Sequence, residues 1–325
     1  MRIAVTGSIA TDHLMTFPGR FTEQLVPDLL DTVSLSFLVD GLDVRYGGVA
    51  ANIAYGLGKL GLRPVMVGAA GKDFAEYGQQ LTAAGVDTSF VRISETLLTA
   101  RFLCTTDHDH NQIAAFYPGA MTEAADIDLA ALIGPHRRFH LVLIGADDPA
   151  AMLRHTQACR DLGIPFAADP SQQLARLDRD QLRRLVNGAR FLFTNAYENA
   201  LLRRRTGWGT ADVLGRVGAW ITTRGADGVT IEQRDGPTLW VPAVPTTRAV
   251  DPTGVGDAFR AGFLTGLAHH RSPAEAARLG CALATRVLET TGSQEYDVRL
   301  DSLVAPHVAD GPAETRAEPF RHDRP

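Results

Sequence analysis

Short apolar runs alternate with helix-forming segments along most of this chain, and this alternation limits the folds open to it. The apolar runs are rich in β-branched and aromatic residues and are predicted strands: Ile3–Val5, Pro64–Val67, Leu141–Ile144, Pro165–Ala168, Phe191–Phe193 and Trp220–Thr222. The segments between them have helical apolar spacing: Val49–Leu60, Phe74–Ala84, Ala150–Leu162, Arg179–Asn187, Tyr197–Thr206, Gly256–His269 and Pro273–Thr290. Strands and helices in alternation pack as a parallel sheet covered on both faces. We therefore predict an α/β fold with a doubly wound, mostly parallel sheet.

Two stretches interrupt this alternation, Asp31–Tyr46 and Thr99–Phe116. Apolar side chains occupy alternate positions in part of the first: Val33, Leu35 and Phe37. The second contains two strand-like segments joined by a polar turn. Outlying strands of this kind indicate a small β-sheet that projects from the main domain like a lid. We expect its strands to come from about residues 12–46 and 99–118.

Composition narrows the class of protein. The chain has 325 residues, a hydrophobic fraction of 45% and a net charge of −5, values that are typical of a globular protein and unfavourable for binding nucleic acid or anionic membranes. No apolar run reaches the ~20 residues that span a bilayer, and the first residues lack a signal-peptide pattern, so we expect a cytoplasmic location. Three widely spaced cysteines are expected to be reduced packing residues: Cys104, Cys159 and Cys281. Residues 1–305 are expected to form the α/β domain, and the polar, proline-containing tail 306–325 to be weakly ordered.

One motif carries most of the chemistry: Asp251-Pro252-Thr253-Gly254-Val255-Gly256-Asp257. Helical spacing continues from it, so two glycines lie where a loop becomes a helix. Free N–H groups at a helix start bind anions, and a carboxylate there could take a proton from a hydroxyl that attacks a phosphate. The pattern indicates phosphoryl transfer from a nucleotide to an alcohol, although an aspartate in a first helical turn is also stabilised by the helix dipole alone. Phe259 replaces the third glycine of a dinucleotide fingerprint, and the chain contains no P-loop motif.

Other polar residues follow predicted strands, where the ligands of parallel sheets bind. Gly47 and Gly48 precede a helix that carries Asn52, whose amide could bind a hydroxyl, although a tolerated helical asparagine is the simpler interpretation. Asp12 follows the first strand together with Ser8. Its carboxylate could accept two hydrogen bonds from a vicinal diol such as a ribose, or it could cap a turn.

Three further groups have both a functional and a structural interpretation. Asn195 and Glu198 could position phosphate or magnesium-bound water, or form the capping box of a helix. A turn with Thr223, Gly225 and Gly228 could hold phosphates through its amides, or simply join two strands of a hairpin. The neighbouring amides Gln172 and Gln173 could read the edge of a planar base or be solvated, whereas the metal-like run His108-Asp109-His110 is expected to be a solvated hairpin turn.

Taken together and in this order, these motifs resemble those of the ribokinase-like (PfkB-type) carbohydrate kinases. More narrowly, the chain is similar to the adenosine kinases of actinobacteria. The stretches that carry this narrower resemblance are Val5–Leu14, Ser34–Asp40, Phe116–Met121, Ala168–Leu177 and Asp251–Gly266. The resemblance covers about residues 1–295.

The resemblance implies a doubly wound core with a β-lid and ATP-dependent phosphorylation of the 5′-hydroxyl of adenosine to AMP, as in purine salvage. Asp257 would be the base, and Gly254, Val255 and Gly256 would form the anion hole. ATP would be accompanied by Mg²⁺, held through phosphates and water near Glu198 rather than by direct protein ligands, and a monovalent cation such as K⁺ could bind near the same loop. Pro252 and Val255 depart from the general family pattern and agree with the adenosine kinases.

The same resemblance assigns the remaining site residues. Those around adenosine would be Ser8, Asp12, Ser36, Gly48, Asn52, Phe102, Phe116, Gln172 and Gln173. Those that contact ATP would be Asn195, Glu198, Thr223, Gly225, Gly228 and Gly256. A homodimer joined through the lid is expected. The alternatives are a kinase for another nucleoside or for a sugar such as ribose or fructose, and a nucleoside-binding sensor without catalysis.

Overall fold

The computed structural model describes residues 1–32, 34–133 and 139–304, and its main element is a nine-stranded sheet. The strands lie in the order β13-β12-β11-β10-β9-β8-β1-β4-β5, and every neighbouring pair is parallel except β11–β12 and β12–β13. Their bounds are β1 (Ile3–Thr6), β4 (Val65–Ala70), β5 (Asp87–Ile93), β8 (Leu141–Ile144), β9 (Phe166–Ala168), β10 (Phe191–Asn195), β11 (Ala219–Thr223), β12 (Val229–Glu232) and β13 (Leu239–Val241). The predicted mostly parallel sheet is confirmed.

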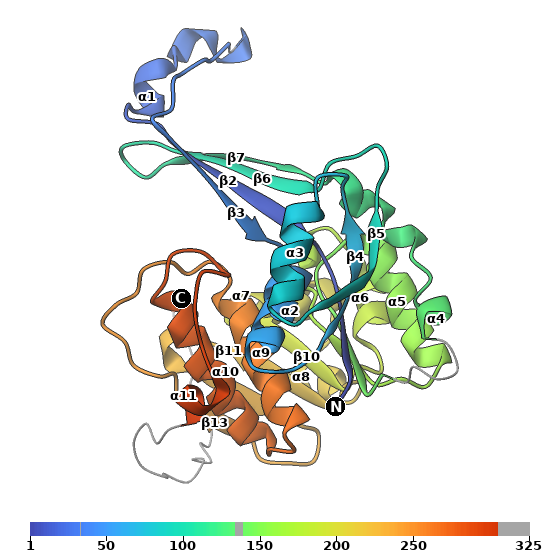
Figure 1. Ribbon diagram of the computed structural model, residues 1–325. Coiled ribbons are helices and arrows are strands. Elements are labelled where there is room, and N and C mark those ends of the chain that lie inside the picture. The colour runs from blue at the N-terminus through green and yellow to red at the C-terminus, as the bar shows by residue number, and fades with distance from the viewer. Residues whose placement is uncertain (33, 134–138, 305–325) are drawn as a thin grey trace.

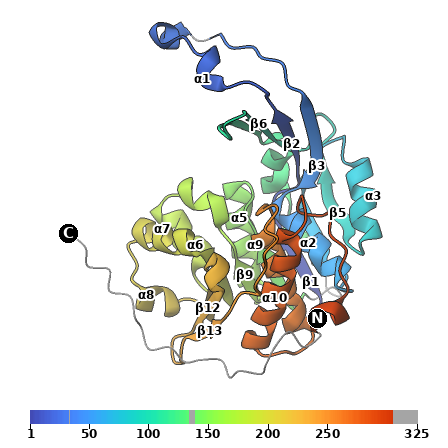
Figure 2. The same ribbon diagram turned by 90° about the vertical axis from the view of Figure 1, so that its left-hand side faces the viewer.

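Helices cover both faces of this sheet (Figures 1 and 2). One hydrophobic cluster joins the sheet to α2 (Val49–Lys59), α3 (Ala75–Ala83), α9 (Val255–Ala268), α10 (Pro273–Leu288) and α11 (Leu300–Val304). A second cluster joins the other face to α4 (Leu129–Leu132), α5 (Pro149–Asp161), α6 (Arg179–Val186), α7 (Ala196–Thr206) and α8 (Thr210–Leu214). Short 3₁₀ segments complete the layers: η2 (Gly119–Asp126), η3 (Ser171–Ala175) and η4 (Gly225–Asp227). The chain is therefore doubly wound, as predicted.

Small residues bring α9 and α10 into close contact. A methyl group on Gly262 would lie 2.7 Å from the Cα of Gly280, and one on Gly266 would lie 2.6 Å from the Cα of Ala276. The helices can approach this closely only because those side chains are missing. α9 is therefore held against the rest of the core along much of its length, which fixes the direction in which its first turn points.

The second sheet projects beyond the main body and is the predicted lid (Figure 1). Its strands are β2 (Ala10–Thr16), β3 (Gly41–Gly47), β6 (Ala100–Thr106) and β7 (Gln112–Tyr117), in the order β3-β2-β6-β7. β2 and β6 are parallel, and the other two pairs are antiparallel. Most of β2 lies within the range 12–46 predicted to supply lid strands, but it was not predicted as a separate strand, because it follows β1 so directly that its residues look like a loop.

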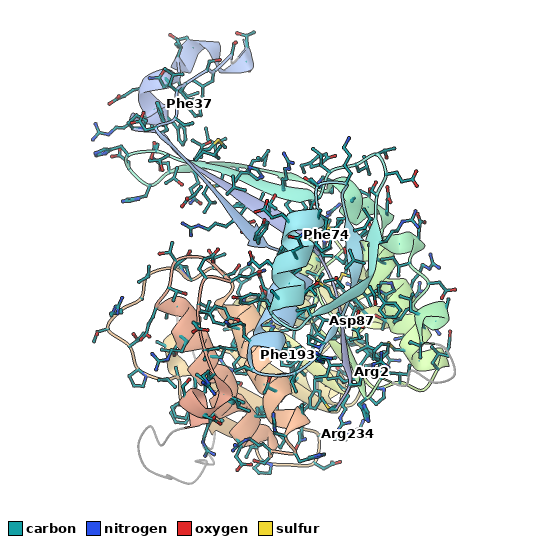
Figure 3. All side chains as sticks on the ribbon, in the orientation of Figure 1. Arg2, Phe37, Phe74, Asp87, Phe193 and Arg234 are labelled. Atoms are coloured by element: carbon teal, nitrogen blue, oxygen red, sulfur yellow. The ribbon has the colours of Figure 1, made fainter. Side chains whose placement is uncertain are left out.

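The alternating segment before β3 does not form the strand that the sequence suggests. Residues 34–39 have no regular structure, and Val33 lies outside the described residues. The ring of Phe37 packs instead on Phe17 and Phe21, at centroid distances of 4.7 and 5.4 Å. This small aromatic cluster lies at the far end of the lid (Figure 3). The alternation therefore reflects burial of one ring in this cluster rather than pairing with another strand.

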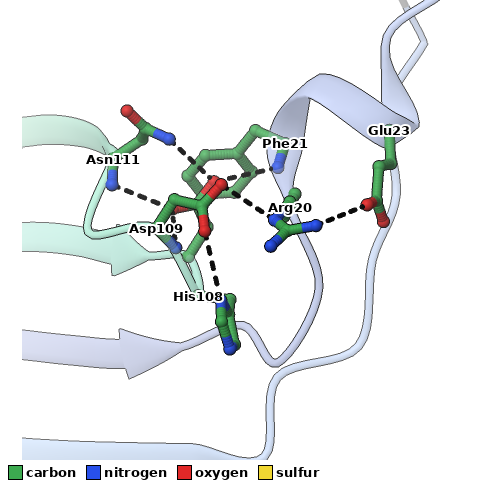
Figure 4. A network of polar contacts seen from close by, with 7 residues as sticks. Arg20, Phe21, Glu23, His108, Asp109 and Asn111 are labelled. Atoms are coloured by element: carbon green, nitrogen blue, oxygen red, sulfur yellow. Dashed lines mark hydrogen bonds and ion pairs between the residues drawn. The ribbon is translucent and has the colours of Figure 1, made fainter.

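The turn that contains His108 and His110 joins β6 to β7, which confirms the expected hairpin. Asp109 accepts a hydrogen bond from Arg20, just before α1 (Phe21–Gln24), with 2.8 Å between Nε and Oδ2, and lies 3.1 Å from His108 Nδ1 (Figure 4). The buried carboxylate of Asp107 accepts hydrogen bonds from the backbone of Phe21, Asp109 and Asn111. These polar residues tie α1, which leads into η1 (Pro27–Thr32), to the tip of the lid.

Several smaller expectations concern the chain as a whole. The three cysteines are buried and free, as predicted for packing residues. Within the described part of the chain, no helix combines the length and apolar character that a membrane span requires. The tail 306–325 lies outside the described residues.

Candidate active site

The predicted phosphate-binding motif forms the start of α9. Gly254 is its N-cap and has a φ of +74°, in the left-handed region that favours glycine. A methyl group on Gly254 would also lie 2.5 Å from the Cβ of Ser293. Val255 and Gly256 follow in the first turn with their N–H groups at the helix start, and Asp257 is the third residue of the helix. The glycine-led helix start that the sequence predicts is therefore present, and its binding of an anion remains a prediction.

A second glycine-led helix start lies beside β1. Gly48 caps α2 with a φ of +96°, and a methyl group there would come within 2.6 Å of the carbonyl oxygen of Ser8. The hydroxyl of Ser8 accepts a hydrogen bond from the Val49 N–H at 3.0 Å, and the Ala50 N–H donates to the carbonyl oxygen of Ser8 at 3.1 Å. These contacts lock the start of α2 onto the end of β1 and place Asn52 one turn inside the helix.

Asn52 and Asp257 meet across the two helix starts, although 205 residues separate them in the sequence. The Asn52 Nδ2 donates to Asp257 Oδ2 at 2.9 Å. The orientation of the Asn52 amide is fixed because its Oδ1 accepts from Ser293 Oγ at 3.0 Å and from Gln294 Nε2 at 2.8 Å. Gln294 Nε2 lies 2.7 Å from the hydroxyl of Tyr77, which itself donates to the backbone. Ser293 and Gln294 were not predicted as site residues, because they lie in no recognisable motif.

The environment of Asp257 suits a proton acceptor. Burial raises the pKa of its carboxyl group to about 7, while the hydrogen bond from Asn52 and the charge of Arg260 act in the opposite direction. Asp169 and Glu198 raise the same pKa further by charge repulsion. A base is most effective when its pKa lies near the working pH. Asp257 can therefore lose and regain a proton near neutral pH.

Asp12 lies at the root of the lid, against a small cavity of about 70 Å³. The cavity is lined by Asp12, Leu14, Arg45, Phe102, Asp251, Thr253, Gly292 and Ser293. Burial raises the pKa of Asp12 to about 6, with the charge of Arg45 opposing and that of Asp251 adding to the shift. Arg45 also lies 3.5 Å from Asp251. The residues that begin the α9 motif and those of the lid thus enclose one small space, lined by charged, polar and apolar side chains.

The lid places the two predicted aromatic residues in one row with Asp12. Asp12 pairs with Phe102, and Phe102 pairs with Phe116 on the next strand, so all three side chains lie on one face of the sheet. Phe116 is 49% exposed, which leaves its ring accessible to a ligand. Ser36, in contrast, lies next to Phe37 at the far end of the lid and is exposed, so the structure does not bring it to this row.

The two predicted glutamines differ in their surroundings. Gln172 is exposed, and its side-chain oxygen accepts a hydrogen bond from Ser171 Oγ at 2.7 Å. Gln173 is buried, and its Nε2 donates to the carbonyl oxygen of Asp147 at 2.7 Å. The interpretation of both as solvated amides is therefore wrong for Gln173, because η3 buries this side chain and its amide binds the backbone of the loop that follows β8.

The residues predicted to contact ATP form the structural motifs that their sequences allow. Asn195 Oδ1 accepts from the Glu198 N–H at 2.8 Å, and Glu198 Oε2 accepts from the Asn195 N–H at 2.7 Å, which is a complete capping box. Thr223 ends β11, and Gly225 and Gly228, with φ values of +58° and +89°, form the hairpin to β12. Both groups follow strands of the main sheet at its carboxyl edge, and their contact with a nucleotide remains a prediction.

Two proteins of similar sequence are nucleoside kinases. A nucleoside kinase of Methanothermobacter thermautotrophicus is 34% identical over 256 residues, which cover 77% of this chain and 80% of that protein. One of Methanocaldococcus jannaschii is 30% identical over 261 residues, covering 80% of this chain and 84% of that protein. These relatives are named for nucleosides in general, so the narrower resemblance to adenosine kinases remains a prediction.

Solved structures and a family model agree with these relatives. The nucleoside kinase of Burkholderia thailandensis in complex with inosine is 38% identical, has a TM-score of 0.81 and covers 93% of this chain and 96% of its own. Its complex with ADP-inosine is 39% identical, with a TM-score of 0.79 and coverage of 93% and 94%. The model of the pfkB family carbohydrate kinases matches residues 6–299. This chain therefore belongs to the PfkB family of carbohydrate kinases.

Proposed function

We propose that this kinase transfers the γ-phosphoryl group of ATP to the 5′-hydroxyl of a nucleoside, with adenosine as the acceptor. The observation that carries the proposal is the contact between Asn52 and Asp257 at the glycine-led start of α9, with 2.9 Å between the amide nitrogen and the carboxylate. It combines a proton acceptor, a hydroxyl-binding amide and an anion-binding helix start at one point.

In the proposed reaction, Asp257 accepts the proton as the acceptor hydroxyl attacks the γ-phosphoryl group in line. The N–H groups at the start of α9 stabilise the negative charge that spreads over the phosphoryl oxygens. Mg²⁺ bound to the nucleotide phosphates would neutralise part of their charge, and Glu198 would hold water ligands of this ion. A monovalent cation such as K⁺ would bind near the anion-binding loop. Closure of the lid over the acceptor would exclude water and limit hydrolysis of ATP.

One feature recognises a ribose and another favours a nucleoside over a free sugar. Asp12 lies where its carboxylate can accept hydrogen bonds from vicinal hydroxyls, which free ribose and a nucleoside share. Phe102 and Phe116 share its row on the lid, and a base can stack on aromatic rings whereas a sugar alone does not need both. The complexes of the Burkholderia thailandensis enzyme with inosine and ADP-inosine support a purine nucleoside. A kinase for another nucleoside or a sugar is the closest alternative.

An assay of ADP release across a panel of nucleosides and sugars tests this proposal. The purified enzyme with ATP and Mg²⁺ is expected to release ADP with adenosine, and ribose or fructose is not expected to compete with it. Faster turnover of another nucleoside would correct the acceptor, and turnover of sugars alone would contradict the nucleoside assignment. A thermal shift with adenosine but no ADP with any acceptor would indicate a sensor instead of a kinase.

The stacking role of Phe116 gives a separate prediction. Phe116→Ala should weaken adenosine binding by about 1–3 kcal/mol, the range for loss of one aromatic ring that stacks on a base. Isothermal titration calorimetry measures this directly. Leu162→Ala is the control, because Leu162 is an apolar residue with a similar exposed fraction of 44% at the end of α5, away from the lid. Equal affinities of wild type and Phe116→Ala would remove Phe116 from the base pocket.

The outer face of the lid is the proposed contact of a homodimer. Leu42, Val44 and Ile113 lie on this face and are 61%, 54% and 48% exposed. Apolar side chains gathered on one face of a projecting sheet favour burial against a second copy. Analytical ultracentrifugation is expected to give a dimer for the wild type and a monomer for Val44→Lys, with Val250→Lys, which changes an exposed valine elsewhere, still a dimer. A monomeric wild type at micromolar concentration would contradict this.

A further inference from the structure

Arg260 is buried next to the catalytic turn, and all three of its guanidinium nitrogens form hydrogen bonds. Its side chain is only 6% exposed. Nε and Nη2 donate to the two carboxylate oxygens of Asp169, each at 2.8 Å. Nη1 donates to the carbonyl oxygen of Gly256 at 3.1 Å. Arg260 thus connects a buried carboxylate to the backbone of the anion-binding turn, three residues after Asp257 in α9.

Asp169 anchors this connection in the centre of the main sheet. It is the first residue after β9, and its N–H donates to the carbonyl oxygen of Ile144, the last residue of β8, at 2.9 Å. The guanidinium carbon of Arg260 also lies 5.5 Å from the ring centre of Phe193 in β10, in the range of a cation–π contact. Through Arg260, the first turn of α9 is therefore attached to the carboxyl ends of β8 and β9 and to the middle of β10.

We propose that Arg260 and Asp169 are a positioning pair for phosphoryl transfer: they fix the first turn of α9 on the sheet and set the electric field at the Asp257 carboxylate. This inference rests on the proposed function of Asp257 as the base. A buried ion pair is a poor source of net stability, because desolvation of both charges offsets their attraction. The pair contributes something more specific here. It fixes a positive charge within one helical turn of Asp257, and its arginine binds the Gly256 carbonyl oxygen.

The charged groups near Asp257 change the pKa of its carboxyl group, so the proposal can be tested by titration of Asp257. Arg260 on α9 favours the ionised form, whereas Asp169 after β9 and Glu198 on α7 oppose it. Tyr296, which follows α10, is a further titratable neighbour and stays neutral, since burial raises its pKa. Removal of the arginine charge should therefore raise the pKa of Asp257, and removal of the Asp169 charge should lower it. The two partners of one ion pair thus predict opposite shifts.

The experiment compares Arg260→Met and Asp169→Asn with wild type in two measurements. Carbon-13 NMR of protein labelled at the aspartate carboxyl groups, with the Asp257 signal assigned through Asp257→Asn, gives its pKa without any substrate. The pH profile of kcat gives the same titration in the working enzyme. We expect the pKa to rise by roughly one unit in Arg260→Met and to fall by roughly one unit in Asp169→Asn. Turnover should fall by roughly 10–100-fold in both, because the reacting groups lose their alignment.

Arg92→Met is the control, because Arg92 forms an exposed ion pair with Glu123 away from the site and should change neither measurement. A purely structural pair would lower thermal stability and turnover in both variants and leave the Asp257 pKa in place, which would overturn the proposal. If Arg260→Met does not fold, Arg260→Gln replaces it and should raise the Asp257 pKa in the same way. If Asp169→Asn does not fold, Asp169→Ser replaces it and should lower that pKa, and unchanged values would again overturn the proposal. A wild type without activity on any nucleoside would contradict the proposed function alone, since the NMR titration does not need turnover.

Discussion

Asp257→Asn is expected to lower kcat by roughly 10²–10⁴-fold, the range for loss of a general base. The asparagine has nearly the same shape and can still accept the hydrogen bond from Asn52 through its side-chain oxygen, so substrate binding should change little. It cannot accept the proton of the attacking hydroxyl. Steady-state kinetics with ATP and adenosine measure the effect, which should appear in kcat rather than in KM.

The stability of the same variant provides its control. Because burial raises the pKa of Asp257 from 3.8 to about 7, ionising this carboxyl group in the folded protein costs free energy. The wild type therefore loses stability as the pH rises through this window, and Asp257→Asn does not share that loss. At pH 8 the variant should be more stable by roughly 0.5–2 kcal/mol, and at pH 4 the two should be similar. Asp297→Asn, in an exposed ion pair with Lys59, should keep normal turnover. Near-normal turnover of Asp257→Asn would exclude Asp257 as the base.

Gly254→Ala is expected to damage both the fold and the activity. The φ of +74° at this position costs an alanine about 1–2 kcal/mol. The added methyl group would also meet Ser293, whose hydroxyl helps to hold Asn52, at 2.5 Å. We expect the free energy of unfolding to fall by at least about 2 kcal/mol and kcat by about 10²-fold, because the anion-binding turn and Asn52 shift together. Urea denaturation and steady-state kinetics measure the two effects.

Gly163→Ala is the matched control for this substitution. Gly163 has a similar φ of +62°, but a methyl group there would meet no atom within 4 Å. It lies at the end of α5, away from the site, so it should show the backbone cost alone and normal kcat. If Gly254→Ala were as mild as Gly163→Ala, the close packing of Gly254 on Ser293 would have no role in the site.

The sequence predicted the central strands well for a physical reason. Strands such as Leu141–Ile144 are buried on both faces, so they are continuous apolar runs that stand out from amphipathic helices. β5 and β12, at or near the edges of the sheet, are partly exposed and mix polar with apolar residues, and they were missed. The lid was predicted only in outline. β2 follows β1 so closely that it does not stand out as a strand, and the alternating segment around Phe37 packs its ring on Phe17 and Phe21 instead of forming a strand.

Some features of the candidate site could also be predicted from the sequence, and others could not. The motif that ends in Asp257 could be predicted because a helix start, its glycines and its carboxylate are neighbours in the sequence. The contact between Asn52 and Asp257 was not predictable from either segment, because it depends on the packing of α2 on α9. Arg260 and Asp169 were missed for the same reason: a charged residue within an apolar helix shows its role only when its partner, 91 residues away, is known.

The most direct test of the central claim is the identity of the product. Phosphorus-31 NMR and mass spectrometry of a reaction with ATP, Mg²⁺ and adenosine should show one AMP for each ADP, with the phosphate on the 5′-oxygen, and Asp257→Asn should form both products at a rate lower by the same factor. ADP that appears with inorganic phosphate and unchanged adenosine, or AMP formed equally fast by the variant, would contradict the account.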